Sequence, residues 1–277
     1  MKNNFDFVNL ILGYFDNKIL FKGGTLMVRF LPDHKIYIKI LYWGMGGSGK
    51  TTVVDTLYRL TREQDKDITP VAELKKICMA SGSTLYFDRG FFQSTKQNKV
   101  FYHVYTVAGQ SRFSPLRERI FKGTDGVIFV VDSQTHFFED NIESLKELKK
   151  VTTFVEEKEL NNQKLSGVSQ YGAIKSPECR LIKQIPLVIM LNKQDLNEVI
   201  GEEDFKQILK EEKLWYTPDH ELSTWNPIIY KTCALYEKQR DVYRSFSECA
   251  RRIGLYQIYG DGKAPIGDSF RKESPKY

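Results

Sequence analysis

The sequence reads Gly44-Met45-Gly46-Gly47-Ser48-Gly49-Lys50-Thr51 directly after an apolar, β-branched run over residues 35–43. A G-x-x-x-x-G-K-[ST] pattern between a strand and a helix is typical of a phosphate-binding loop. Its glycines let backbone N–H groups turn toward phosphate oxygens, and the dipole of the following helix adds positive potential there. The pattern therefore predicts a nucleoside triphosphate site. The alternative interpretation is a glycine-rich turn with a solvated lysine.

Separate roles are expected within this stretch. The Lys50 ammonium reaches the β- and γ-phosphates, and the Thr51 hydroxyl binds Mg²⁺. A side chain at Gly46 would crowd the γ-phosphate. The residues expected to contact the nucleotide are Gly44, Gly46, Gly47, Ser48, Gly49, Lys50, Thr51 and Thr52.

A second motif predicts which base is bound. The apolar run over residues 186–191 is typical of a strand buried on both faces of a parallel sheet, and it leads into Asn192-Lys193-Gln194-Asp195. Ligands bind at the carboxyl ends of such strands. The Asp195 carboxylate can accept from the N1–H and N2–H₂ groups of guanine, a pair of donors that adenine lacks. Asn192 is expected to brace the loop and the Lys193 stem to lie on the base. The alternative is a polar strand-to-helix turn.

A third motif completes the order of signals along the chain. Thr106-Val107-Ala108-Gly109-Gln110 follows a strand pattern over residues 99–105, and another buried apolar strand spans residues 126–132. The order is phosphate loop, Gly-Gln turn, apolar strand, then Asn-Lys-x-Asp.

Together these motifs resemble the small Ras-like GTPases, and the residues that carry the resemblance are 44–51, 106–110, 122–134 and 192–195. The gliding-motility (MglA-type) branch is the most similar, because it shares the Thr-Val-x-Gly-Gln turn and a Thr-Leu-aromatic-Phe-Asp strand, here residues 84–88. Residues 113–133 also resemble the Arf and signal-receptor-β branch. The resemblance covers about residues 35–255. It implies an α/β fold, a P-loop NTPase of Ras-like type with a mostly parallel central sheet flanked by helices.

The resemblance also implies catalytic and guanine-contacting residues. Gln110 would orient the attacking water, Lys50 would neutralise phosphate charge, and Gly109 would contact the nucleotide. In residues 231–235, Cys233 and Ala234 would occupy the family's fifth motif, whose backbone N–H binds the guanine O6.

The first switch is harder to align. Ser81 is favoured as its Mg²⁺ ligand over Thr69, Ser83 and Thr84, since direct spacing to the MglA-type pattern falls near Met79, which cannot ligate a metal. Thr106 stands where the family usually has an aspartate near Mg²⁺. Asp88 is a candidate substitute.

Composition narrows the class of protein. The chain has 277 residues, 41% of them hydrophobic, and a dispersed formal charge of +6. No apolar run is long enough to span a bilayer, and no lipidation signal is present, so membrane contact would be indirect at most. No nucleic-acid partner is expected. Four scattered cysteines predict free thiols in a reducing, cytoplasmic setting rather than disulfides or a zinc site.

The expected organisation is an N-terminal extension (residues 1–34), a GTPase domain (35–255) with a loop insertion at about 158–184, and a flexible C-terminal tail (256–277). Met27 is a candidate translation start. Helices are expected at residues 50–62, 114–121, 141–157, 202–212 and 236–252. Basic residues after Gln110 are expected to form either a solvated helix face or a surface for an acidic partner; they are Arg112, Arg117, Arg119 and Lys122.

These patterns predict a switch that binds GTP or GDP with Mg²⁺ and hydrolyses GTP slowly. Effectors and a GTPase-activating or exchange protein would bind its switch loops. Two alternatives remain at this point: a nucleotide-gated scaffold without useful turnover, and a P-loop kinase or ATPase.

Overall fold

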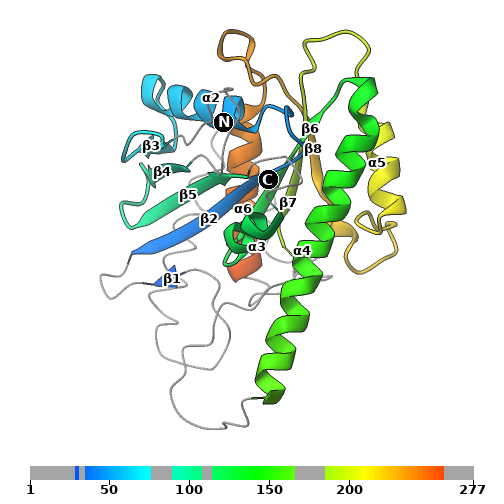
Figure 1. Ribbon diagram of the computed structural model, residues 1–277. Helices are drawn as coiled ribbons and strands as arrows, with labels where there is room; N and C mark the ends of the chain where they lie inside the picture. The colour runs from blue at the N-terminus through cyan, green and yellow to red at the C-terminus, as the bar shows by residue number, and fades with distance from the viewer. Residues whose placement is uncertain (1–28, 31–34, 76–88, 108–113, 166–184, 259–277) are drawn as a thin grey trace.

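The computed structural model describes residues 29–30, 35–75, 89–107, 114–165 and 185–258 (Figure 1). The strands are β1 (Arg29–Phe30), β2 (Ile36–Trp43), β3 (Ile68–Pro70), β4 (Arg89–Ser94), β5 (Val100–Thr106), β6 (Gly126–Asp132), β7 (Leu187–Asn192) and β8 (Ile228–Lys231). The α-helices are α2 (Lys50–Glu63), α3 (Ser114–Phe121), α4 (Phe138–Leu165), α5 (Glu202–Glu211) and α6 (Val242–Ile258). Short 3₁₀ helices are η2 (Thr135–Phe137), η3 (Ser223–Trp225) and η4 (Tyr236–Lys238).

All the described strands belong to one sheet. Its order is β3-β4-β5-β2-β6-β7-β8, with β1 paired to the start of β2. Strands β5, β2, β6, β7 and β8 are parallel to one another, whereas β1, β3 and β4 pair antiparallel. The carboxyl ends of the parallel strands therefore meet at one edge. The expected α/β fold with a mostly parallel sheet flanked by helices is confirmed.

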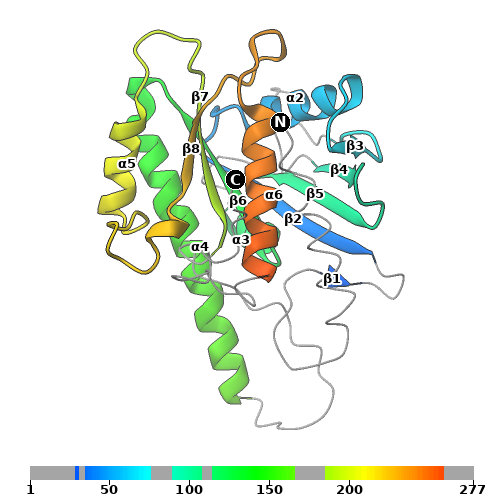
Figure 2. The same cartoon turned by 180° about the vertical axis from the view of Figure 1, so that it is seen from behind.

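The sheet separates two apolar cores. Helices α2 and α6 pack on one face against residues such as Ile40 and Ile128, and α3, α4 and α5 pack on the other against Leu41 and Phe129 (Figures 1 and 2). Side chains alternate between the two faces along a strand, so β6 and β7, buried along their whole length, contribute to both cores. This burial fixes the positions of the strand ends.

Helix α2 starts at the phosphate loop. Its N-cap, Gly49, has a left-handed conformation (φ 96°) that glycine adopts at no steric cost. Val53, Leu57 and Leu60 then recur at helical spacing and are fully buried. This apolar stripe anchors the helix to the sheet and holds its N-terminus at the carboxyl edge.

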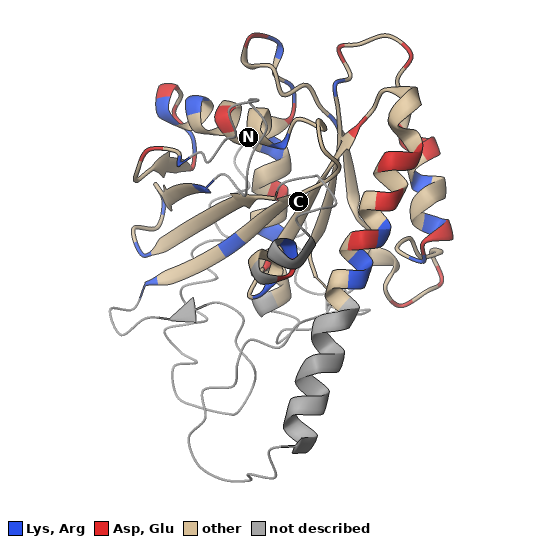
Figure 3. Ribbon diagram, in the orientation of Figure 1, with Lys and Arg blue, Asp and Glu red and all other residues tan. Residues whose placement is uncertain are grey.

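Charged side chains of both signs are dispersed over the described helices (Figure 3). Helix α5 begins with Glu202, Glu203 and Asp204, which complement the positive end of its dipole.

Within the described residues, no helix combines the length and apolar character that a bilayer crossing needs.

Several element boundaries agree closely with expectation. Strand β6 and helix α3 have the expected bounds, and β2, β5, β7, α2 and α5 differ by at most two residues at either end. The antiparallel strands β3 and β4 had not been expected. The strand expected at residues 84–88 lies outside the described residues.

Helix α4 is longer than the expected helix at 141–157, since it runs from Phe138 to Leu165. Residues 158–165, expected to open a loop insertion, are therefore helical. Asn161 and Asn162 favour a loop, but the Glu, Lys and Leu residues around them are strong helix formers and sustain the helix. The rest of the expected insertion, 166–184, lies outside the described residues, as do most of the expected extension and tail.

Helix α6 starts later than expected: it begins at Val242 instead of residue 236. Before it, the backbones of Cys233 and Arg240 pair with each other, and Asp241 adopts a positive φ of 55°. The chain reverses there, so residues 236–238 form only the short helix η4. Val242, Phe246, Cys249 and Ile253 recur at helical spacing along α6 and pack in the core on one face of the sheet.

Arg117 was expected at the surface, and this expectation is wrong. Its side chain is buried, forms an ion pair with Glu147 of α4 and lies over the Trp43 ring. Burial lowers the pKa of the Arg117 guanidinium, and the Glu147 carboxylate opposes that shift. Helical spacing alone could not distinguish the buried side of α3 from its exposed side. Arg112 and the Arg119 side chain lie outside what the structure describes, while Lys122 is exposed.

We expect Glu147→Leu to lower the free energy of unfolding by about 3 kcal/mol, because it leaves the buried Arg117 charge without its carboxylate. The double variant Arg117→Met/Glu147→Leu removes both charges and is expected to recover most of this loss. Urea unfolding of the three proteins measures both effects. A single variant as stable as the original chain would show that the ion pair contributes little.

Candidate nucleotide-binding site

Four segments of the chain meet at the carboxyl edge of the sheet (Figure 1). The loop 44–49 follows β2, residues 133–134 follow β6, residues 193–195 follow β7 and residues 232–234 follow β8. This edge is the place where open α/β sheets bind ligands. Two of these segments are the phosphate-loop and Asn-Lys-x-Asp motifs, and a third contains the proposed fifth motif.

Glycines let the phosphate loop approach the neighbouring strands closely. Gly44 and Gly49 have positive φ values of 148° and 96°. A Cβ on Gly44 would lie 2.2 Å from the backbone oxygen of Val130, and one on Gly49 would lie 2.4 Å from Asn192 Nδ2. The loop can therefore sit against β6 and β7 only without side chains at these two positions.

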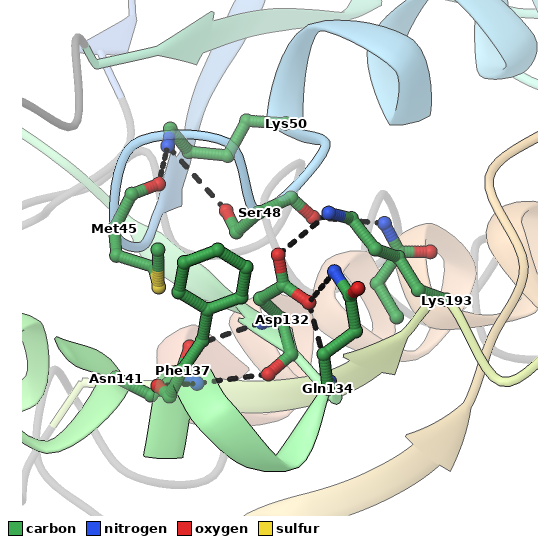
Figure 4. Close-up of polar contacts among 9 residues, drawn as sticks. Met45, Ser48, Lys50, Asp132, Gln134, Phe137, Asn141 and Lys193 are labelled. Carbon is green, nitrogen blue, oxygen red and sulfur yellow. Dashed lines mark hydrogen bonds and ion pairs between the residues drawn. The ribbon is translucent and has the colours of Figure 1, made fainter. Parts of the chain in front are cut away.

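The Lys50 side chain folds back over the loop (Figure 4). Its Nζ donates hydrogen bonds to the Gly44 oxygen (2.9 Å) and the Met45 oxygen (2.6 Å), and it lies 3.5 Å from Ser48 Oγ. The lysine side chain is buried, and the loop's own carbonyls hold its ammonium in place. This arrangement puts a fixed positive charge beside inward-turned backbone, which is the chemistry of an anion site.

Asn192 links the two motifs directly. Its Nδ2 donates to the Ser48 oxygen at 2.9 Å, so the expected bracing of the loop is confirmed. Among the described residues, its buried Oδ1 has no hydrogen-bond partner. An unsatisfied buried acceptor is costly, so this atom fits a site where a ligand donor completes the hydrogen bonding.

Asp195 and Cys233 lie together at the start of the segments that follow β7 and β8. The exposed Asp195 carboxylate contacts the buried Cys233 thiol, and burial together with this carboxylate raises the pKa of the thiol. Gln194 N donates to the Thr232 oxygen at 3.1 Å and joins the same two segments. Asp195 is thus held beside Cys233, and its exposed carboxylate can accept hydrogen bonds from guanine.

Sequence reasoning assigned no role to Asp132, yet it is central to the site. Its buried carboxylate accepts from Lys193 Nζ at 2.6 Å, and the Lys193 ammonium also lies 5.9 Å from the centre of the Phe137 ring (Figure 4). The sequence feature that could have predicted this role is the position of Asp132, a carboxylate at the end of the apolar strand β6, which lies between β2 and β7 in the sheet.

Of the remaining predicted site residues, five lie in the part of the chain that the structure describes and three lie outside it. Thr51 and Thr52 lie half-buried on the first turn of α2, Gly46 and Gly47 are exposed, and Ala234 is buried and accepts a hydrogen bond from Thr56. Ser81, Gly109 and Gln110 lie outside the described residues. Within the described part of the chain, no three His, Cys, Asp or Glu side chains gather closely enough to hold a metal.

The model of the ADP-ribosylation factor (Arf) family matches residues 25–165. The chain belongs to this family. It is therefore a small GTPase of the Ras-like P-loop type and a GTP-binding switch. Members of the family bind guanine nucleotides, generally hydrolyse GTP, and interact with regulators and effectors. The expected P-loop fold class is confirmed.

Two sequence relatives agree with this assignment. Mutual gliding-motility protein MglA of Myxococcus xanthus (strain DK1622) is 31% identical over 186 residues, which are 64% of this chain and 77% of that protein. ADP-ribosylation factor-like protein 4A of Mus musculus is 25% identical over 189 residues, 67% of this chain and 72% of that one. A solved structure of the Arl6 BBS3 small GTPase from Trypanosoma brucei with bound GppNp is 19% identical with a TM-score of 0.47, covering 78% of this chain and 97% of that one. The expected MglA-type and Arf resemblance is confirmed.

We expect Gly44→Ala to abolish nucleotide binding, because its Cβ would collide with the Val130 backbone oxygen at 2.2 Å. Gly47→Ala is the matched control. It also carries a positive φ, 81°, but its Cβ would meet no described atom within 4 Å, so most of the affinity is retained. Fluorescent GDP titration compares the two. Equal affinities would show that the close contact with β6 does not shape the loop.

Proposed function

We propose that this Arf-family protein binds GTP with Mg²⁺ through the residues at the carboxyl edge and hydrolyses it slowly as a conformational switch. The observation that carries the proposal is the Asn192–Ser48 hydrogen bond, which joins the base-reading motif to the phosphate loop. The Asp195–Cys233 contact next to it supports guanine as the base.

The proposed roles follow from the chemistry of each group. Lys50 and the loop amides, including those of Gly46, Gly47 and Ser48, bind the phosphates. Asp195 accepts from the guanine N1–H and N2–H₂ groups, and a backbone N–H of Cys233 or Ala234 donates to O6. Gly109 contacts the nucleotide, and Gln110 orients the attacking water. Bound Mg²⁺ would neutralise charge on the β- and γ-phosphates.

The proposed metal site is made of oxygen donors. Mg²⁺ is usually held by one or two protein oxygens with waters and substrate phosphates, and the hydroxyl of Thr51 fits that role. Ser81 is the proposed second hydroxyl, from the first switch. Thr106, whose side chain is buried at the end of β5, replaces the usual aspartate, so the outer shell of the metal lacks that carboxylate unless Asp88 supplies it.

The proposed partners are an activating or exchange protein and effectors that bind the switch loops. GTP would order these loops through its γ-phosphate, and hydrolysis would release them. We place this cycle in the cytoplasm, with no nucleic-acid partner and with membrane contact only through another protein.

Single-turnover hydrolysis by the purified chain tests the switch. We expect a rate of about 10⁻⁴ to 10⁻² per second without a partner. Gly46→Val is expected to retain GTP and hydrolyse it more slowly still, because the added side chain crowds the γ-phosphate. Bound GTP with no measurable phosphate release from either protein would instead favour the nucleotide-gated scaffold. Equal rates in the two proteins would remove Gly46 from the reacting site.

A second test addresses the base. Asp195→Asn is expected to weaken GDP binding by about 1.5–3 kcal/mol, the usual value of a hydrogen bond to a charged group. Competition of labelled GDP by unlabelled GDP and by ATP measures affinity and base preference in both proteins. If ATP competes as well as GDP against the original chain, guanine recognition is refuted and an ATPase or kinase is favoured.

A further inference from the structure

The Asp132 carboxylate is fully buried at the end of β6, and both of its oxygens are used (Figure 4). Oδ2 accepts from Lys193 Nζ at 2.6 Å. Oδ1 accepts from the Gln134 backbone N at 3.2 Å and from Gln134 Nε2 at 3.0 Å. Three donors therefore fix the orientation of one carboxylate beneath the Asn-Lys-x-Asp segment.

The backbone of Asp132 is fixed as well. Its N–H donates to Asn141 Oδ1 at 3.0 Å, and Asn141 Nδ2 donates to the Asp132 oxygen at 2.8 Å. Asn141 is fully buried on α4. Because both the main chain and the side chain are held, Asp132 presents a preorganised negative charge to Lys193.

Lys193 is under constraint at its backbone. It adopts φ 66°, a left-handed conformation that is unfavourable for a residue with a Cβ. The residue before it, Asn192, braces the phosphate loop, and Asp195 lies two residues after it. A change in the backbone conformation of Lys193 would therefore move both Asn192 and Asp195, the proposed guanine contact.

We infer that Asp132 is a positioning residue for nucleotide binding: its ion pair holds Lys193 in the left-handed conformation and so aligns Asn192 and Asp195 on the base. This inference rests on the proposed guanine site. The Lys193 side chain is 28% exposed, whereas the Asp132 side chain is fully buried. The ion pair therefore runs from the core to the binding edge.

A buried aspartate just before the same strand provides the contrast. Asp125 precedes β6 at the opposite edge, is buried like Asp132, and its Oδ2 accepts from the backbone N of Lys39 at 2.7 Å. Asp125 stands before the amino-terminal end of β6, whereas Asp132 stands at its carboxyl-terminal end. Loss of Asp125 can change stability, but it gives no reason for faster nucleotide release.

The test is the release rate of fluorescent GDP, measured with melting temperature on the full chain. Asp132→Asn is expected to speed release about tenfold to a hundredfold, the effect of losing one hydrogen bond to a charged group. Asp125→Asn is expected to leave release unchanged. A merely structural role for Asp132 predicts that both variants lower the melting temperature and neither changes release, and that result would overturn the inference.

Coupling to Lys193 makes the test specific. Lys193→Met keeps the apolar stem and removes the charge, so adding Asp132→Asn to it is expected to speed release by less than twofold further. An additive effect of the two substitutions would contradict positioning through the ion pair.

If Asp132→Asn does not fold, Gln134→Met removes one donor to the carboxylate and is expected to speed release several-fold; an unchanged rate there would count against the inference. If the original chain binds no GDP, it is the proposed function that fails, whereas normal GDP binding with unchanged variants refutes this inference alone.

Discussion

The close fit of the phosphate loop against the ends of β6 and β7 is the constraint on which the rest of the site depends. Asn192 reaches across to the Ser48 oxygen at 2.9 Å, and Gly49 leaves room for that side chain because a Cβ would lie 2.4 Å from its Nδ2. Gly44 allows the same closeness to β6. The loop that would hold phosphates and the segment that would read the base are thereby one rigid unit, and its geometry is set before any ligand arrives.

The two cores supply the rigidity that this contact needs. Strands β6 and β7 are buried along their whole length, so the residues at their ends, Asp132 and Asn192, stand on positions that packing fixes. The polar groups there are arranged in pairs: Lys193 with Asp132, and Asp195 with Cys233. The Lys50 ammonium lies against the loop carbonyls of Gly44 and Met45 and beside Ser48 Oγ, and it is the group best placed to meet an anion.

The sequence predicted the parts of the structure that depend on local pattern. Strand β6 and helix α3 have the expected bounds, because apolar runs and helical spacing are local properties. Contacts between distant segments could not be read in this way. The burial of Arg117 depends on Glu147 of α4 and on Trp43, and the role of Asp132 depends on a lysine of another strand's end. The late start of α6 likewise follows from the pairing of Cys233 with Arg240, which competes with helix formation over residues 236–241. The predictions for Ser81, Gly109 and Gln110 stay predictions, since these residues lie outside the described part of the chain.

The central claim is that the carboxyl edge binds a guanine nucleotide. The most direct measurement is to denature the protein purified from cells without added nucleotide and to identify what it releases by chromatography. We predict GDP or GTP at close to one molecule per chain, because the loop and the Asn192–Asp195 segment form a preorganised site. Release of ADP or ATP, or of no nucleotide by a folded protein that also takes up no added GDP, would contradict the account.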